Sequence, residues 1–274
     1  MPLLATFSSH TGSRLELYRI TYSAEERIAT IVLNCPEKNN SLDNHVVAEL
    51  NHAFLQAQRD SSVKLILLRA EGDDFCTGTD PDHLERTSKF DFNQNLQDSA
   101  DMMKLFMQIY TLRKPVIALV QGRALAAGCG LAAVCDFIVA AHETARFGFT
   151  ESKEGSIPAL ALIFLVRRIG EARARELAIR GRIIDADEAQ RIGLINQVAP
   201  AIELEVAGKK LAAELIAENS SASMRLIKEL LSRMHGMSLD DTIDYASNLQ
   251  ALTRMTDECK KGIEALRNNK VPRW

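Results

Sequence analysis

The chain has 274 residues, of which 46% are hydrophobic and 25% are charged. These fractions are typical of a globular protein and exclude a disordered or collagen-like chain. The 33 Lys and Arg residues and the 36 Asp and Glu residues give a net charge of −3, so no overall positive field attracts nucleic acid or an anionic membrane.

The five cysteines include no C-x-x-C pair, which favours reduced thiols over disulfides or zinc ligation and predicts a reducing compartment. The N-terminus lacks the basic region and apolar core of a secretory signal. The most apolar stretch, residues 116–141, contains Arg123 and Asp136, and its longest uncharged run is shorter than the roughly 20 residues of a bilayer span. We therefore predict a cytoplasmic protein without a membrane-spanning segment.

Predicted strands and helices alternate in the first half of the chain. Residues 15–22 and 28–33 are expected to form a hairpin around a polar turn at residues 23–27. Ser41 or Asp43 is placed to cap a helix that carries apolar residues at helical spacing. The elements that follow are a strand at 65–69, a helix with one face marked by Leu96, Ala100, Met103, Phe106 and Tyr110, and a buried strand at 116–120.

The second half begins with a glycine-punctuated turn, a short helix and a strand at 137–140, and it is helical in pattern from Ala159 onward. Asp185 and Glu188 resemble the capping box of a helix at 186–192.

Strands that alternate with helices predict the α/β fold class, with a layered core. We divide the chain into a core at residues 1–200 and a C-terminal helical region at residues 201–274, which we expect to serve packing or oligomerisation.

Several strong functional motifs are absent from the sequence: the G-x-x-x-x-G-K-[ST] phosphate loop, the H-E-x-x-H zinc helix and the G-x-S-x-G nucleophile elbow. The six His residues form no pair at metal-ligand spacing, and we predict no metal site. Residues 128–133 match the G-x-G-x-x-G/A dinucleotide pattern, but six or more residues separate them from the strand at 116–120. Close packing explains these residues better than a nicotinamide-binding oxidoreductase, which rests on this pattern alone.

Two loops of small residues follow buried strands, one at residues 75–80 and the other at residues 122–128. Backbone N–H groups in such loops can approach a ligand without obstruction by side chains. Two N–H groups that converge would form an oxyanion hole, which stabilises the negative oxygen of an enolising thioester. Each loop taken alone is equally well explained as a tight turn.

Seven segments, in chain order, carry recognisable motifs. They are Asn34–Leu42 (N-x-P-x-K-x-N-[AS]-L), Phe75–Asp80 (F-[CS]-[AS]-G-x-D), Lys114–Gly122 (K-P-[VT]-I-A-x-[VI]-x-G), Cys135-Asp136 (C-D), Phe147–Glu151 (F-G-x-P-E), Gly181–Asn196 and Gly262–Trp274. Together they resemble the motifs of the crotonase (enoyl-CoA hydratase/isomerase) superfamily, over nearly the whole chain beyond residue 15.

The resemblance implies a crotonase-like ββα spiral core with a C-terminal helical trimerisation region, assembled as a homotrimer or a dimer of trimers. The implied substrate is an acyl-CoA thioester, and no cofactor is implied beyond the coenzyme A that belongs to the substrate. Carried over by position, the N–H groups of Thr79 and Ala127 would form the oxyanion hole. The implied CoA-binding residues are Lys38, for a phosphate, and Phe75, Cys76 and Gly78, at the adenine end.

The departures from the family pattern bear on the reaction. Typical hydratases of the family carry a glutamate where this chain has Gly130, and Ala126 and Ala127 replace two of three glycines. Hydration benefits from two carboxylates that hold one water, whereas moving a double bond needs one base beside an enolate. Glu151 is the matched carboxylate that remains, so we expect isomerase-type proton transfer by this single glutamate.

Other functions stay open at this point. The alternatives are a 2-enoyl-CoA hydratase, a thioester hydrolase or decarboxylase of the same family, and a non-catalytic acyl-CoA-binding scaffold. Glu154 stands where a leucine is common, and residues 158–161 replace a glycine-rich run, so the acyl pocket is expected to differ from that of typical members.

Overall fold

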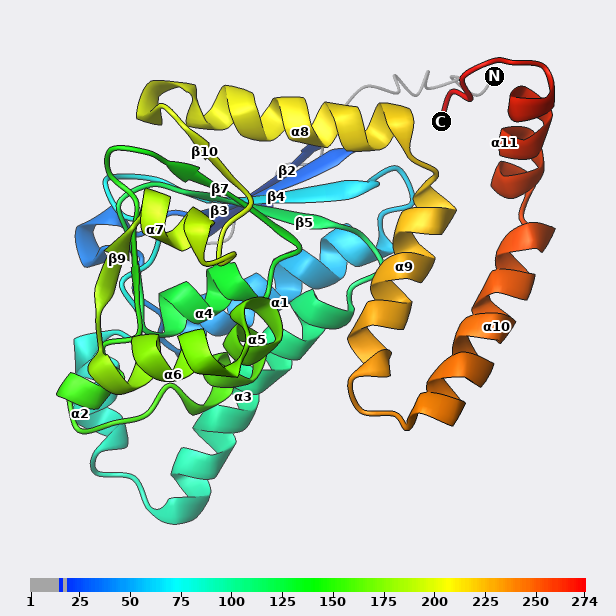
Figure 1. Ribbon diagram of the computed structural model, residues 1–274. Helices are drawn as coiled ribbons and strands as arrows, with labels where there is room; N and C mark the ends of the chain where they lie inside the picture. The colour runs from blue at the N-terminus through cyan, green and yellow to red at the C-terminus, as the bar shows by residue number, and fades with distance from the viewer. Residues whose placement is uncertain (1–14, 17–18) are drawn as a thin grey trace, which may run out of the picture.

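The computed structural model describes residues 15–16 and 19–274, and it shows helices packed on both faces of a twisted sheet (Figure 1). Within the described chain the main sheet has seven strands in the order β1-β2-β3-β4-β5-β7-β10. They are β1 (Leu15–Glu16), β2 (Ile20–Glu25), β3 (Ile28–Leu33), β4 (Leu65–Ala70), β5 (Val116–Val120), β7 (Phe137–Ala141) and β10 (Gln197–Ala199). The first three strands pair antiparallel, and β3 through β10 pair parallel.

A second, three-stranded sheet lies beside the first. Its strands are β6 (Arg123–Leu125), β8 (Arg146–Gly148) and β9 (Ile183–Asp185). Strand β8 pairs parallel with β6 and antiparallel with β9. Because β6 and β8 pair in parallel, their C-terminal residues, Leu125 and Gly148, lie side by side although they are more than twenty residues apart in sequence.

Both faces of the central strands are buried, as their continuous apolar runs predict. In β4, Ile66 and Leu68 face one hydrophobic cluster, while Leu65 and Leu67 face another. The first cluster packs against α1 (Asn44–Arg59), α3 (Phe92–Thr111), α4 (Ala127–Ala133) and α5 (Ala159–Ile169), among other elements. The second packs against α8 (Leu204–Glu218).

The remaining helices are short or C-terminal. They are α2 (Pro81–Thr87), α6 (Glu171–Arg180), α7 (Ala186–Arg191), α9 (Ser221–Met234), α10 (Leu239–Met255), α11 (Asp257–Arg267) and the 3-10 turns η1 (Pro36–Lys38), η2 (Glu151–Lys153) and η3 (Ala201–Glu203). Figure 1 shows α10 and α11 standing away from the sheet, which α8 covers. The division at residue 200 stays a prediction, and residues 1–14 of its first part lie outside the described chain.

The predicted α/β class is confirmed, and the central strands fall within one residue of their predicted bounds. The predicted bounds of the first hairpin were wrong, because residues 15–16 form a separate strand, β1, which pairs with β2. Strand β2 runs to Glu25, and only Glu26 and Arg27 form the turn, with φ of 49° and 70°. Such two-residue turns normally carry Asn or Gly, so Glu26 and Arg27 did not indicate a turn of this length. Residues 17–18 of the predicted strand lie outside the described chain.

The predicted face of α3 is only half right. Phe106 is buried, but Leu96 is 57% exposed and Ala100 is exposed as well. The N-terminal half of α3 extends past the sheet (Figure 1). The helical spacing of apolar residues in this half therefore does not mark a face that packs on the core. The predictions also missed the helix α2 and the three-residue strands β6, β8, β9 and β10. Strands of three residues carry too little periodicity to be recognised.

Local capping decides two helix starts. Asp43, not Ser41, caps α1 by accepting hydrogen bonds from His45 N and Val46 N at 3.0 and 2.9 Å. Asp185 caps α7 through Glu188 N at 2.8 Å, but the Glu188 carboxylate pairs with Arg182, so only half of the predicted capping box forms.

Four cysteines are buried and all five are free thiols, as predicted. Burial raises the pKa of Cys76, Cys129 and Cys135 to about 12. These thiols are therefore inert at neutral pH. In the part of the chain that is described, no helix has the length and apolar character needed to cross a bilayer.

One buried ion pair ties α9 to the sheet. Lys228 is 7% exposed, and its Nζ donates to Asp136 Oδ2 at 2.5 Å and to Lys114 O at 3.1 Å. Asp136 Oδ2 also accepts from Val116 N at 2.7 Å. The first residue of β5, the residue before β7 and the middle of α9 therefore meet at a single carboxylate.

We predict that Lys228→Ala lowers the free energy of unfolding by about 2–3 kcal/mol, because it leaves the carboxylate of Asp136 unpaired. Urea denaturation followed by circular dichroism measures the change. The control is Lys210→Ala, which removes an exposed lysine of α8 and should change stability by less than about 0.5 kcal/mol. Equal effects of the two substitutions would show that the ion pair between Lys228 and Asp136 does not stabilise the fold.

Candidate active site

The two loops singled out in the sequence are paired along their backbones. Cys76 N donates to Arg123 O at 3.0 Å, and Leu125 N donates to Cys76 O at 3.0 Å. The carboxylate of Asp74 accepts from Arg123 N, Nε and Nη2 at 2.8, 2.9 and 2.6 Å. These charge-assisted bonds from Arg123 hold the pKa of Asp74 below its ordinary value. The register of one loop on the other is thereby fixed.

Close approach of the loops requires glycine at the start of α4. A Cβ added at Gly128 would lie 2.1 Å from the carbonyl oxygen of Cys76, which is far inside contact distance. The glycine therefore serves packing, as the sequence analysis favoured over nucleotide binding.

The two predicted oxyanion-hole amides, from Thr79 and Ala127, sit where these loops meet. Leu42 N donates to Gly78 O and Asp80 N donates to Leu42 O, at 2.7 and 2.9 Å, so the backbone bonds flank Thr79. Ala127 is the first residue of α4, where a helix leaves its N–H groups unpaired. Neither N–H has a hydrogen-bond acceptor among the described residues. Both residues line one cavity of about 720 Å³.

Glu151 lines the same cavity, just beyond the end of β8. Gly148, the last residue of β8, pairs with Leu125 of β6, and Gly148 O accepts from Ala126 N at 2.8 Å. The carboxylate is therefore positioned by the same small sheet that leads into α4. Its Oε2 atom is buried and has no hydrogen-bond partner among the described residues.

The environment of Glu151 favours its neutral form. Burial raises the pKa of this carboxyl above its ordinary value, and the negative charge of Glu154 nearby raises it further. A carboxyl group with a raised pKa is a stronger base than an ordinary glutamate, which suits a group that must accept and return a proton.

The space beside Gly130 is filled. A Cβ added here would lie 2.6 Å from the Cβ of Ala161 and 3.2 Å from Cε2 and Cζ of Phe106. The carboxylate that typical hydratases of the resembled family carry at this position is thus absent, and two neighbouring side chains occupy its place.

The predicted CoA-binding residues lie in different environments. Lys38 lines the cavity, but its Nζ pairs with Asp80 at 3.0 Å and Asp82 at 3.6 Å, and the bond to Asp80 raises the pKa of the lysine. Phe75 and Cys76 are fully buried, and their N–H groups donate to Gln121 O and Arg123 O.

Gly78 lies directly before the Thr79 amide, with φ of 105°. Neither Gly78 nor the Phe75–Cys76 pair lines the cavity. Contact of coenzyme A with Lys38, Phe75, Cys76 and Gly78 stays a prediction.

One wall of the cavity was not foreseen. It comes from the projecting half of α3, which contributes Asp98, Ser99, Asp101 and Met102. His83 of α2 also faces this wall, but Arg86 donates to its Nδ1 at 3.2 Å and Asp98 lies 2.9 Å from its Nε2. Both ring nitrogens are therefore occupied, and His83 has none free for a substrate. A polar helix face on its own gives no signal that it borders a cavity.

A sequence profile of the family described as Enoyl-CoA hydratase/isomerase matches residues 23–274. The chain belongs to this family. The resemblance drawn from the seven motifs is thereby confirmed, and with it the expectation of an enzyme of the enoyl-CoA hydratase/isomerase type.

Relatives and solved structures agree with this membership. A Thermus thermophilus protein provisionally named an enoyl-CoA hydratase is 38% identical over 90% of this chain and 97% of its own. A crotonyl-CoA hydratase of Syntrophomonas wolfei is 33% identical over 90% of this chain and 94% of its own. The crystal structure of an enoyl-CoA hydratase from Geobacillus kaustophilus superposes with a TM-score of 0.90 at 26% identity, covering 96% and 99% of the two chains. The predicted crotonase-like core is confirmed.

Ala126, in the second loop and directly before α4, holds a backbone conformation that suits glycine. Its φ is 50° and its ψ is −126°, a region in which a Cβ is strained. The family pattern has glycine here, so this chain carries strain directly beside the Ala127 amide, which is predicted to belong to the oxyanion hole.

We predict that Ala126→Gly raises the free energy of unfolding by about 1 kcal/mol, because relief of strain outweighs the added freedom of the unfolded chain. Ala132→Gly, in the regular part of α4, should instead lower it by about 1 kcal/mol. Chemical denaturation of both variants measures the changes. Destabilisation by both substitutions would show that position 126 is unstrained.

Proposed function

We propose that this enzyme moves the double bond of a 3-enoyl-CoA to the 2-position, through an enolate, with Glu151 as the only acid–base group. The observation that carries the proposal is the buried, unpartnered Oε2 of Glu151 in the same cavity as the free amides of Thr79 and Ala127. The filled space at Gly130 supports it further, since no second carboxylate can lie there.

The chemistry needs one proton to be carried between two carbons. The carboxylate of Glu151 removes a proton from C2, and the electron pair of the broken C–H bond forms an enolate whose oxygen lies between the two N–H groups. The enolate then collapses, the double bond forms between C2 and C3, and the carboxyl of Glu151 returns the proton to C4. The thioester stays intact, and the reaction needs no cofactor beyond the coenzyme A of the substrate.

The proposed assembly is a homotrimer or a dimer of trimers. Its support is the apolar surface on the C-terminal helices, where Leu231, Leu252 and Met255 are 53%, 56% and 72% exposed. A monomer would leave this surface in water.

We predict that Glu151→Gln lowers kcat/KM for a 3-enoyl-CoA by about 10³-fold, because the amide cannot accept the C2 proton. Proton NMR in D₂O follows migration of the double bond and exchange at C2 in one sample. Glu214→Gln, on the exposed face of α8, is the matched control and should be fully active. Undiminished turnover by Glu151→Gln would overturn the mechanism.

Hydration is the second candidate, and Glu154 is the observation that favours it. Glu154 lies one 3-10 turn after Glu151, lines the same cavity and accepts from Thr150 Oγ1 at 3.1 Å. An exposed carboxylate that activates water and a buried carboxyl that donates a proton would together add water to a 2-enoyl-CoA. The two relatives described above are named hydratases.

Glu154→Gln separates the two functions. Under the isomerase proposal this variant keeps its turnover of 3-enoyl-CoA, whereas a hydratase would lose its turnover of 2-enoyl-CoA. Binding of acyl-CoA by the unmodified protein without any reaction would instead favour a non-catalytic scaffold.

We predict that kcat/KM of the unmodified enzyme falls on the acid side at a pH above the ordinary range of a glutamate. The base must be ionised, and the raised pKa of Glu151 means that it takes up its proton at a higher pH. Glu154→Gln removes a neighbouring negative charge, so the acid limb of its pH–rate profile should move to lower pH. An acid limb at the same pH in this variant would show that the charge of Glu154 does not affect the pKa of Glu151.

A further inference from the structure

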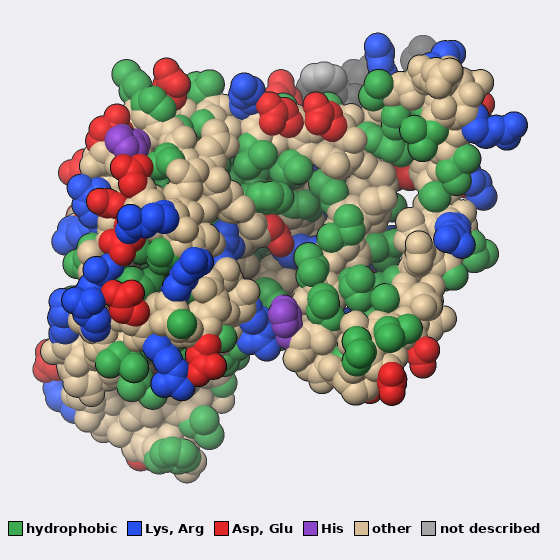
Figure 2. Space-filling model, in the orientation of Figure 1, with side chains coloured by type: hydrophobic (Ala, Val, Ile, Leu, Met, Phe, Trp, Pro, Cys, Tyr) green, Lys and Arg blue, Asp and Glu red, His purple; other side chains and the backbone are tan. Residues whose placement is uncertain are grey.

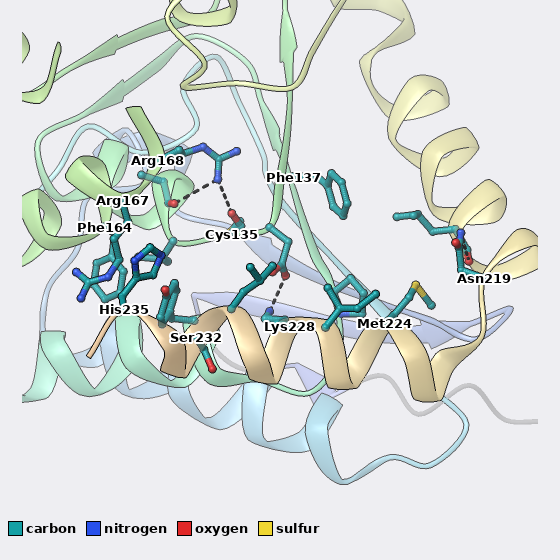
Figure 3. A pocket seen from close by; sticks show the side chains of 18 residues that line it. Cys135, Phe137, Phe164, Arg167, Arg168, Asn219, Met224, Lys228, Ser232 and His235 are labelled. Atoms are coloured by element: carbon teal, nitrogen blue, oxygen red, sulfur yellow. Dashed lines mark hydrogen bonds and ion pairs between the residues drawn. The ribbon is translucent and has the colours of Figure 1, made fainter. Parts of the chain in front are cut away.

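A second cavity, of about 450 Å³, lies between the core and the C-terminal helices (Figure 3). We call it the apolar cavity, and its walls include Tyr110, Phe164, Met224 and Leu231. Figure 2 shows hydrophobic side chains gathered around the hollow between α8 and α9. No function has been assigned to it above.

The charged groups on its wall are already paired. Lys228 binds Asp136, as described, and Arg168 donates to Cys135 O at 2.7 Å and to Asn196 Oδ1 at 2.8 Å (Figure 3). Arg167, which also lines the cavity, donates to Ile163 O at 2.9 Å. The rest of the wall is mostly apolar.

A pair of aromatic rings connects the wall of this cavity to the wall of the active-site cavity. Phe106 lines the active-site cavity and Phe164 lines the apolar cavity. Their ring centroids are 6.0 Å apart at an interplanar angle of 82°, which is an edge-to-face contact. Tyr110, one turn after Phe106, packs on Phe164 at 5.1 Å. Phe106 and Phe164 are 1% and 3% exposed, so neighbours hold both rings in place.

The ring of Phe106 is also close to the proposed reaction centre. Its Cε2 and Cζ atoms lie 3.2 Å from the Cβ position of Gly130, which is three residues after the Ala127 amide in α4. Three residues of helix span about 4.5 Å. An acyl group whose oxygen binds at Ala127 therefore has the Phe106 ring within a few carbon atoms of its carbonyl.

We propose that the Phe106–Phe164 pair is the end wall of the acyl pocket and restricts the enzyme to short acyl groups. The inference rests on the proposed acyl-CoA function, but not on which reaction follows. The absence of a side chain at Gly130 is what lets Phe106 occupy this position. Beyond the wall the apolar cavity would receive a longer chain if the wall were opened, with a gain in affinity of about fourfold for each buried CH₂.

The test is the binding of saturated acyl-CoAs of 4 to 16 carbons, measured by calorimetry for the unmodified protein, Phe106→Ala and Phe106→Leu. For the unmodified protein we expect affinity to stop rising after a short chain. In Phe106→Ala the break should move to longer chains, and the affinity for the 12-carbon ligand relative to the 4-carbon ligand should rise at least tenfold. Phe106→Leu, which is less disruptive, should move the break in the same direction.

Phe54→Leu is the matched control, since Phe54 is a fully buried phenylalanine of α1 that lines neither cavity. It should lower the melting temperature without changing the relative affinity. A chain-length profile that is the same in all four proteins would overturn the inference, and so would a steady gain per CH₂ up to 16 carbons in the unmodified protein.

Turnover of 3-enoyl-CoA is measured in parallel, so the two proposals can fail separately. If the chain length at which affinity stops rising changes in the Phe106 variants but no protein turns over 3-enoyl-CoA, the end wall is supported and the isomerase proposal is contradicted. If the proteins turn over 3-enoyl-CoA but this chain length is the same in all of them, only the proposal of the end wall is contradicted.

Discussion

The active site depends on one backbone pairing, in which Cys76 exchanges hydrogen bonds with Arg123 and Leu125. This pairing places the Thr79 amide and the Ala127 amide beside one cavity, although they are nearly fifty residues apart in sequence. Gly128 allows the approach, because any side chain there would meet the Cys76 carbonyl. Strand β6 then continues the constraint through its ladder with β8 to Glu151. The proposed base and the proposed oxyanion hole are consequently joined by one continuous set of backbone hydrogen bonds, which suits electrostatic stabilisation that must exist before the reaction begins.

Burial without a partner gives Glu151 its chemical character. A carboxylate that accepts several hydrogen bonds is held in its charged form and is a weak base, as Asp74 with its three bonds from Arg123 illustrates. Glu151 Oε2 has no such partner among the described residues, and its pKa is raised. Two acidic side chains thus lie in opposite environments: Asp74 holds the loops together through its bonds to Arg123, and Glu151 has the environment that the proposed proton transfer requires.

The sequence predicted the central strands, the two loops and the place of Glu151, because strongly apolar runs and spaced motifs are local properties of the chain. It did not predict the turn at Glu26 and Arg27, where residues without turn propensity are held at positive φ by strands already in register. Nor did it predict the exposure of Leu96, since helical periodicity does not tell where the partner sheet ends. The wall at Phe106 depends on contacts between α3, α4 and α5, and no single segment carries that information.

The contacts at Gly130 connect the two proposals, the one on the type of reaction and the one on the size of the acyl group. Loss of a side chain at this position removes a carboxylate that would repel the charge of Glu151 or share a water with it. The same loss opens a space in α4 into which Phe106 and Ala161 pack, and Phe106 is thereby brought against Phe164. A glutamate placed at position 130 would collide with both side chains, so the catalytic group and the shape of the pocket cannot change independently. The proposed absence of a carboxylate at position 130 and the proposed depth of the acyl pocket therefore depend on the same few contacts.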